Sequence, residues 1–201
     1  MICGGLLKKS MNNTHYITAI TYILLLRFLD LALTFIYTPD LRYEWNPVVS
    51  VFNYSWIGML VTQIFIVSFI LAVMSFYFFK KPIINLPEDL SFKDYIYFYF
   101  HNEKKTKKRQ YIKPTRQTLD RVLAYNGFIL MTLAISVSYL AIINNIMVIR
   151  KVRAYSNFIS DHGSVFYISV LVIMAILSFL LFFTLEYRSY RRKLIKVYIN
   201  E

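Results

Sequence analysis

The sequence predicts an all-α membrane protein, with four transmembrane helices in a single domain (residues 1–201) and a further helix at the cytoplasmic membrane interface. Of the 201 residues, 57% are hydrophobic, which exceeds the roughly 45–50% apolar content of an ordinary soluble domain. Charged residues are absent from 45–79, 122–149 and 163–185. Each stretch is longer than the ~18 apolar residues that suggest a membrane span, so three spans follow directly.

The first predicted span covers 16–37 and carries charges near its middle. Its 22 residues would rise about 33 Å as a helix, which fits the roughly 30 Å hydrocarbon core of a bilayer. Arg27 and Asp30 interrupt it, and each charge costs about 2.5–3.5 kcal/mol at the bilayer centre on insertion scales. We therefore expect both side chains to face protein or water rather than lipid.

The second uncharged stretch is too long for one upright helix. A helix from Val48 to Phe79 would measure about 48 Å. We expect an interfacial or re-entrant turn over 47–54, followed by a span over about 55–79. A strongly tilted, longer helix is the alternative. The remaining two spans are predicted over 122–149 and 163–185.

Basic residues orient the four spans. The predicted N-terminal tail to Thr14, the loop 80–121 and the C-terminal tail from Glu186 together carry 18 Lys and Arg residues. The predicted short loops 38–47 and 150–162 on the opposite side carry 4. Positively charged loops are retained in the cytoplasm, so we expect a multi-pass protein of the cell inner membrane with both termini in the cytoplasm.

The basic cytoplasmic loop 80–121 holds the predicted interfacial helix. Pro87 and Ser91 are typical of a helix start, and the aromatic run Tyr95–Phe100 follows. We assign contact with anionic lipid headgroups to the basic cluster after this run: Lys104, Lys105, Lys107, Lys108 and Arg109. The alternative is a helix packed under the bundle, beside charges that only set the topology.

Polar side chains form a stripe on the first span. Arg27, Asp30 and Thr34 are separated by three and four positions, so they share a helix face with Ile23 and Tyr37. Arg27 and Asp30 can pair on this helix. Two interpretations carry equal weight: a site for a proton, an ion or a polar substrate, or an ion pair that locks the bundle.

A short motif links this stripe to the following loop. Asp30 and Thr34 are followed by the segment Glu44-Trp45-Asn46-Pro47. On these residues the chain resembles a poorly characterised family of small prokaryotic multi-span membrane proteins, with an Asp in the first span and an E-x-N-P turn before the second. The resemblance covers about residues 23–60, supports the topology and implies no reaction. It marks five motif positions: Asp30, Thr34, Glu44, Asn46 and Pro47.

Glu44 and Asn46 have two interpretations of equal weight. Asn46 before Pro47 is typical of a helix start, with Asn as the N-cap and Pro at the first helical position. The charge of Glu44 would also favour the positive end of that helix. Alternatively, Glu44 and Asn46 face Asp30 across a small polar pocket at the outer leaflet.

The third span carries a pattern typical of helix packing. Ala134 and Ser138 have the spacing that lets two membrane helices approach closely, and Asn145 continues the same face. We expect this face to contact another helix or subunit.

Farther on, the segment 161–164 contains Asp, His and Ser, but adjacent positions cannot hold the geometry of a nucleophilic triad. We predict a turn there that caps the fourth span.

We expect neither catalytic residues nor a metal or cofactor. His15, His101 and His162 are far apart, and Cys3 is the only cysteine, so no internal disulfide can form. The net charge of +12 follows the membrane topology and no nucleic-acid-binding module is visible, so no nucleic-acid partner is expected.

The preferred function is therefore a small non-enzymatic membrane subunit or scaffold. Its expected partners are membrane lipids, anionic ones in particular, and a membrane protein or further copies of the chain. The alternative is a small transporter or an intramembrane enzyme with a polar site around Asp30 and Glu44, assisted by Arg27 and Asn46.

Overall fold

The computed structural model describes residues 2–41, 55–80, 89–101 and 115–199, and these ranges are helical with short connecting turns and no strand. The predicted all-α fold is confirmed. The elements are α1 (Ile2–Tyr37), α3 (Trp56–Ser75), the π-helical turn η1 (Phe76–Lys80), α4 (Phe92–His101), α5 (Arg116–Ile149) and α6 (Arg153–Ile199).

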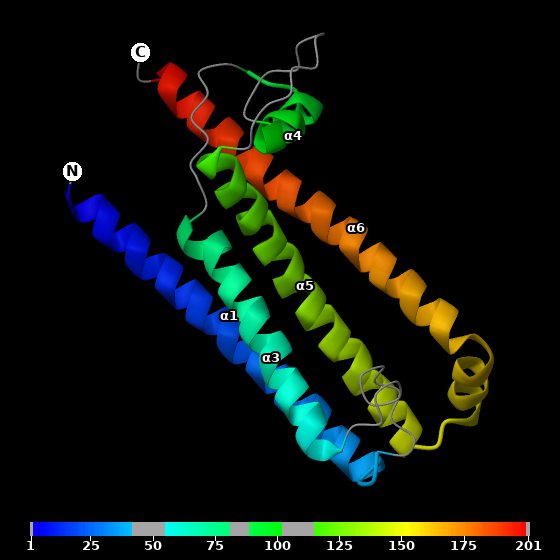
Figure 1. The fold of residues 1–201 in the computed structure, drawn as a ribbon. Helices are drawn as coiled ribbons and strands as arrows, with labels where there is room; N and C mark the ends of the chain where they lie inside the picture. Colours follow the sequence, from blue (N-terminus) through cyan, green and yellow to red (C-terminus); the bar gives the residue numbers. More distant parts are fainter. Residues whose placement is uncertain (1, 42–54, 81–88, 102–114, 200–201) are drawn as a thin grey trace.

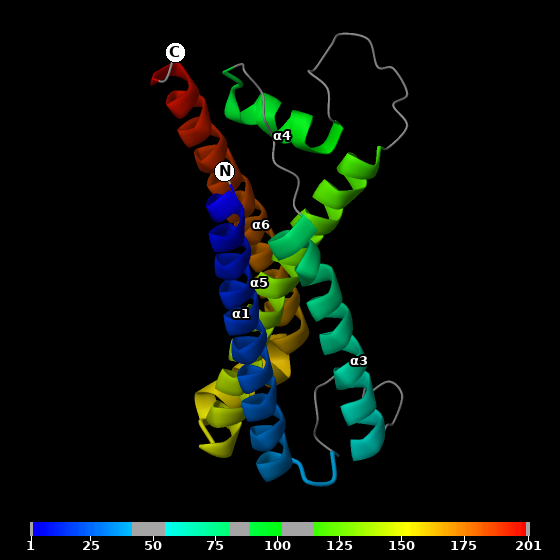
Figure 2. The same ribbon diagram turned by 90° about the vertical axis from the view of Figure 1, so that its left-hand side faces the viewer.

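Four of these segments are long and apolar enough to cross a bilayer, as predicted. They are Asn12–Tyr37, Trp56–Lys80, Arg116–Ile149 and Asp161–Ile195. The four helices alternate in direction, so both chain termini lie at one end of the bundle together with α4 (Figure 1). We call this the terminal end, and the opposite end the loop end. The short helix α4 lies across the terminal end (Figure 2).

The start of the second span agrees with its prediction. The helix α3 begins at Trp56, and Ser55 precedes it in an extended conformation at the N-cap position. The predicted interfacial turn over 47–54 lies outside the described residues. The π-helical turn η1 then continues α3 to Lys80, which gives the span the length the hydropathy predicts.

The helices extend farther than the predicted spans, which corrects several boundaries. Helix α1 is already helical at Ile2, and α6 runs from Arg153 to Ile199, so the predicted tails and most of the loop 150–162 are helical instead. At about 1.5 Å per residue, the 47 residues of α6 rise about 70 Å. Charges mark where a helix leaves the hydrocarbon, but the backbone hydrogen bonds continue beyond that point.

The predicted turn over 161–164 is wrong for a related reason. This segment lies inside α6, where the ribbon bends near the start of the helix (Figure 1). A helical glycine costs only about 1 kcal/mol relative to alanine. Here Gly163 is buried, as is Ile159 one turn earlier, so packing offsets that cost.

The aromatic run on α4 packs under the bundle. Tyr95 and Tyr99 are fully buried, and the Tyr99 ring lies edge-on to Phe182 and Phe183 of α6 at centroid distances of 5.5 and 5.4 Å. The Tyr99 hydroxyl donates a hydrogen bond to the carbonyl oxygen of Arg121 at 3.1 Å. This packing agrees with the second interpretation of the run, in which its rings contact protein.

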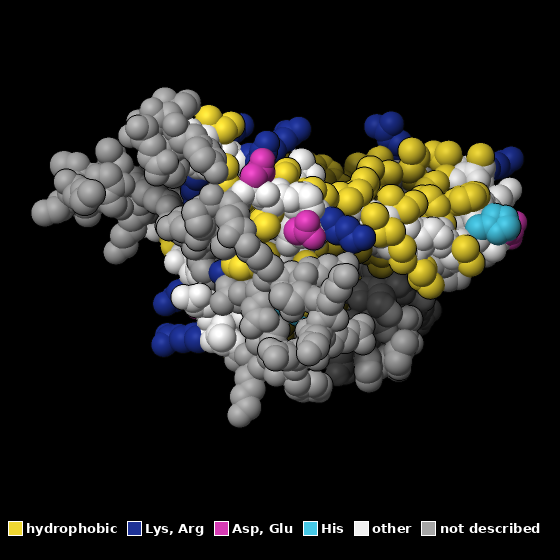
Figure 3. Space-filling model, turned by 90° about the horizontal axis from the view of Figure 1, so that it is seen from above, with side chains coloured by type: hydrophobic (Ala, Val, Ile, Leu, Met, Phe, Trp, Pro, Cys, Tyr) yellow, Lys and Arg dark blue, Asp and Glu magenta, His cyan; other side chains and the backbone are white. Residues whose placement is uncertain are grey.

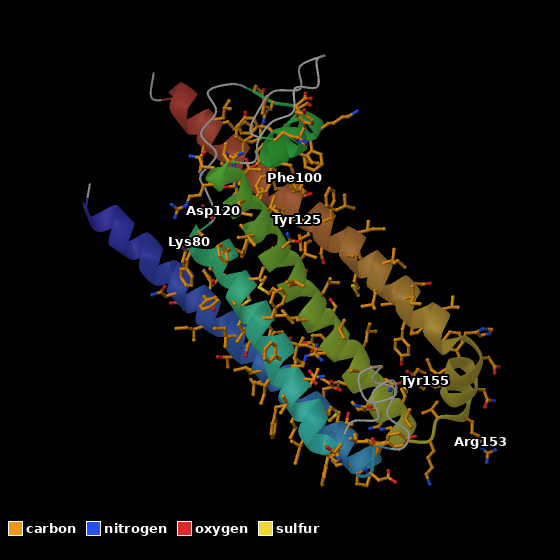
Figure 4. All side chains as sticks on the ribbon, viewed as in Figure 1. Lys80, Phe100, Asp120, Tyr125, Arg153 and Tyr155 are labelled. Carbon is orange, nitrogen blue, oxygen red and sulfur yellow. The ribbon has the colours of Figure 1, made fainter. Side chains whose placement is uncertain are left out.

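Phe100 of α4 and Tyr125 of α5 also pack edge-on, with a distance of 5.6 Å between their ring centroids. Figure 4 labels both residues near the terminal end. The α4 helix is therefore fixed to both α5 and α6. The basic cluster that follows it, from Lys104 to Arg109, lies outside the described residues, so its contact with lipid headgroups stays a prediction.

Helix α5 is the centre of the bundle, because α1, α3, η1, α4 and α6 all pack against it. It approaches α3 closely at Gly127. A Cβ atom built at Gly127 would lie 2.5 Å from the carbonyl oxygen of Val73 and 3.0 Å from the Cα of Met74. The absence of a side chain at this position thus sets the distance between the two helices.

We expect Gly127→Ala to destabilise the protein by about 1–3 kcal/mol, because the backbone of α3 must move to admit the methyl group. Thermal unfolding in detergent micelles measures this loss. A suitable control is Ala72→Leu, which adds a larger group at an exposed position of α3. Equal melting temperatures for the wild type and Gly127→Ala would contradict the close approach.

Candidate functional site

The two charges of α1 form an ion pair inside the bundle. The Arg27 Nη1 atom lies 3.7 Å from the Asp30 Oδ2 atom, and the two side chains are only 15% and 16% exposed. The prediction that these charges can pair on one helix is confirmed, and protein covers most of both side chains. Because Arg27 and Asp30 are three residues apart, they leave the same side of α1.

Helix α5 supplies a neutral partner for this pair. The Asn145 amide nitrogen Nδ2 donates to Asp30 Oδ1 and to Thr34 Oγ1, at 3.2 Å in each case. Asn145 and Thr34 are both buried. The structure therefore brings three predicted residues of α1 together with one residue that lies 115 positions later in the chain.

The local sequence of both helices explains this geometry. On α1, Ile23 is buried one turn before Arg27, so an apolar residue and three polar residues form one stripe against α5. On α5, Ala134 and Ser138 are buried on the facing side. The Ser138 hydroxyl donates to the Ala134 carbonyl at 2.7 Å, which satisfies it within its own helix. The predicted helix-packing face of the third span is thus confirmed.

The charge balance of the site is local. Each oxygen of the Asp30 carboxylate faces a donor: Oδ2 faces Arg27 and Oδ1 accepts from Asn145. The Arg27 Nε atom is buried and has no hydrogen-bond partner. Because an isolated ion is costly in hydrocarbon, the pair must stay together, and Asn145 ties it to α5. The arrangement can hold α1 and α5 in one register.

The remaining motif positions cannot be compared with this cluster. Glu44, Asn46 and Pro47 lie outside the described residues, so the predicted pocket between them and Asp30 stays a prediction. A shallow cavity of about 510 Å³ does lie at the loop end. The described residues that line it come from the ends of α1 and α5 and the start of α6, and none of the ion-pair residues is among them.

Two polar contacts were not predicted. The first is the hydrogen bond between Asn145 and Asp30. Both residues lie in the part of their helices nearest the loop end, but the sequence pattern does not pair them. The second joins α5 to α6: Asn144 Oδ1 accepts hydrogen bonds from the Tyr155 and Tyr167 hydroxyls, at 2.8 Å each. Figure 4 shows Tyr155 at the loop end. Two adjacent asparagines in an uncharged span are the sequence signal for both contacts.

Within the described ranges, no three His, Cys, Asp or Glu side chains come close enough together to hold a metal ion. Comparison of the chain with protein-family models, with curated proteins and with solved structures finds no match. The site therefore has to be interpreted from its own geometry.

We expect Asn145→Leu to lower the free energy of unfolding by about 1–2 kcal/mol, the range that model peptides give for hydrogen bonds between membrane helices. The matched control is Asn126→Leu on the same helix. Asn126 is exposed, and its side chain donates only to the Val122 carbonyl one turn away. Equal losses for the two variants in a detergent unfolding titration would contradict the role of Asn145.

The ion pair predicts strong non-additivity. Arg27→Met and Asp30→Leu each leave a buried charge without its partner, and each should cost about 3–5 kcal/mol. The double variant removes both charges and should be more stable than either single variant. Unfolding of all four proteins in micelles measures the coupling energy. Additive losses would show that the two side chains do not depend on each other.

Proposed function

We propose that this protein is a non-enzymatic membrane subunit that binds another membrane protein along the loop-end half of α6. The supporting observation is the exposure of this half. From Val165 to Leu177 none of the residues with a described side chain is buried, and Val165 and Ile168 are 69% and 62% exposed. The exposed apolar positions also include Leu171, Val172, Ile173 and Ile176.

Because successive residues turn by about 100°, these positions cover an arc of about 200° of the helix, and Tyr167, which bonds to α5, lies on the remaining side. An exposed apolar arc of this width can contact lipid and still present a face to a further helix. Seen from above, hydrophobic side chains form a broad band over the α6 side of the molecule (Figure 3). Association between membrane helices depends on van der Waals packing, for which such a surface is suited.

Both ends of this exposed segment are fixed to α5. At the loop end, the Asn144 side-chain oxygen accepts hydrogen bonds from the Tyr155 and Tyr167 hydroxyls. Toward the terminal end, the Thr132 hydroxyl donates to the Ser178 hydroxyl at 2.8 Å. The segment between them is thus held in place by the bundle itself. A preformed surface loses little conformational entropy when a partner binds.

The site on α1 also supports a structural role. The Asp30 carboxylate is engaged by Arg27 and Asn145, so it serves as a clamp between α1 and α5. The alternative of a transporter or intramembrane enzyme depends on Glu44, whose contacts lie outside the described residues. The proposal includes the expected orientation, with both termini and the basic cluster in the cytoplasm at the inner membrane. It also includes the family resemblance carried by Asp30, Thr34 and the segment Glu44-Trp45-Asn46-Pro47.

A photo-crosslinking residue tests the partner surface. Placed at Val172 of α6 in cells, it should form a covalent adduct with a protein, because that side chain would lie at the interface. The control is the same residue at Ile64 of α3, which is 66% exposed and should meet lipid. An adduct of twice the chain mass identifies a second copy, and any other mass a different subunit. No adduct at Val172, or equal adducts at both positions, would contradict the proposal.

A further inference from the structure

A cavity at the terminal end forms a groove that is separate from the site on α1. It has a volume of about 1310 Å³ and lies between α1, η1 and the C-terminal half of α6, with α4 and α5 also contributing. Pockets for drug-sized ligands usually measure about 300–1,000 Å³. The groove is therefore large enough for an organic molecule rather than an ion or a few water molecules.

The walls of the groove change from polar to apolar along its length. Asn12 and His15 of α1 and Lys193 of α6 line it toward the terminal end. Tyr22 and Met131 line it toward the middle of the bundle. Ten residues separate Asn12 from Tyr22, which is about 15 Å of helix. Such a gradient fits an amphiphile whose polar group lies toward the terminal end and whose apolar body points into the bilayer.

Glu186 is the only carboxylate among the described residues that line the groove. It is 8% exposed, which is unusual for an acidic side chain. Lys193, the one Lys or Arg among these lining residues, follows Glu186 by two helical turns and lies nearer the terminal end. A ligand that reaches past Lys193 therefore approaches the Glu186 carboxylate among largely apolar side chains, where charge–charge attraction is strong.

Aromatic rings surround this carboxylate. Tyr77, Tyr95 and Tyr190 line the same groove, and the Tyr95 and Tyr190 rings pack at a centroid distance of 5.1 Å. Burial raises the pKa of Tyr95 and Tyr99, the negative charge of Glu186 raises both pKa values further, and the positive charge of Arg121 lowers them. The carboxylate thus lies within electrostatic reach of these rings. Aromatic rings around an anionic group favour a cation, because the ring faces also attract positive charge.

We infer that the groove binds an organic cation attached to an apolar body, with the cation at Glu186 and the apolar body toward Tyr22 and Met131. The cation can come from the ammonium group of a lipid such as phosphatidylethanolamine or from a free lipophilic amine.

This inference goes beyond the proposed subunit role. The groove lies along the terminal half of α6, from Leu185 to Lys193, whereas the proposed partner surface ends near Leu177. Loss of cation binding would leave crosslinking at Val172 unchanged, so the two proposals fail separately.

Two probes of equal shape and opposite charge test the inference. Purified full-length protein in phosphatidylglycerol nanodiscs is titrated with tetraphenylphosphonium, a lipophilic cation, and with the anion tetraphenylborate. The wild type should bind the cation saturably, and Glu186→Gln should weaken this binding at least tenfold. Asp120→Asn is the matched control and should bind like the wild type, because Asp120 lies on α5 outside the lining of the groove (Figure 4).

Phosphatidylethanolamine then distinguishes the source of the cation. If this lipid displaces the probe when it is added to the nanodiscs, the natural ligand is the lipid ammonium group; if it does not, a free amine occupies the site. Equal cation binding by the wild type and Glu186→Gln would overturn the inference, as would preferential binding of tetraphenylborate.

A second pair of variants keeps the test valid if Glu186→Gln fails to fold. Tyr77→Leu removes a ring from the groove and should weaken cation binding severalfold, whereas Tyr77→Phe keeps the ring and should bind like the wild type. Circular dichroism and size-exclusion chromatography confirm that each variant is folded. Equal binding by the two Tyr77 variants would also count against an aromatic cation site.

Discussion

Helix α5 has to pack against every other described element, and this constraint determines much of its sequence. In a bilayer the hydrophobic effect does not drive helices together, so close van der Waals contact and interhelical hydrogen bonds hold the bundle. Gly127 allows the backbone of α3 to approach. Farther along, Ala134 and Ser138 present small side chains to α1, and Asn145 donates a hydrogen bond to Asp30 of that helix. Different positions of one helix thus set its distances to different partners.

The polar contact with α1 does more than satisfy a charge. An apolar helix can slide or rotate against another apolar helix at little cost, because many registers bury similar surface. Asp30 can receive the Asn145 amide only in one register, and leaving the ion pair without this donor in hydrocarbon is unfavourable. The charges on the first span, which increase the cost of inserting it, therefore specify where it stops relative to α5. This is consistent with a buried polar group that fixes the register of helices.

The sequence was sufficient for those features that depend on local pattern. Hydropathy identified four spans, and the spacing of Arg27, Asp30 and Thr34 placed them on one protein-facing stripe. Helix ends were not predictable from charge, because α6 continues through Asp161 at one end and past Glu186 at the other. The pairing of Asp30 with Asn145 was also beyond local pattern: it joins residues 115 positions apart, and only the packed bundle shows that they lie at the same depth.

Helix α6 combines two surfaces that differ in chemistry. Phe182 and Phe183, buried against Tyr99, lie between the exposed apolar segment and the groove. From Val165 to Leu177 the helix offers mostly apolar side chains, which suits a dry contact with another helix. Toward the terminal end it offers Glu186 among tyrosine rings, which suits a charged amphiphile from the membrane interface. Because the aromatic cluster fixes the helix between these regions, each surface can keep its shape when the other is unoccupied.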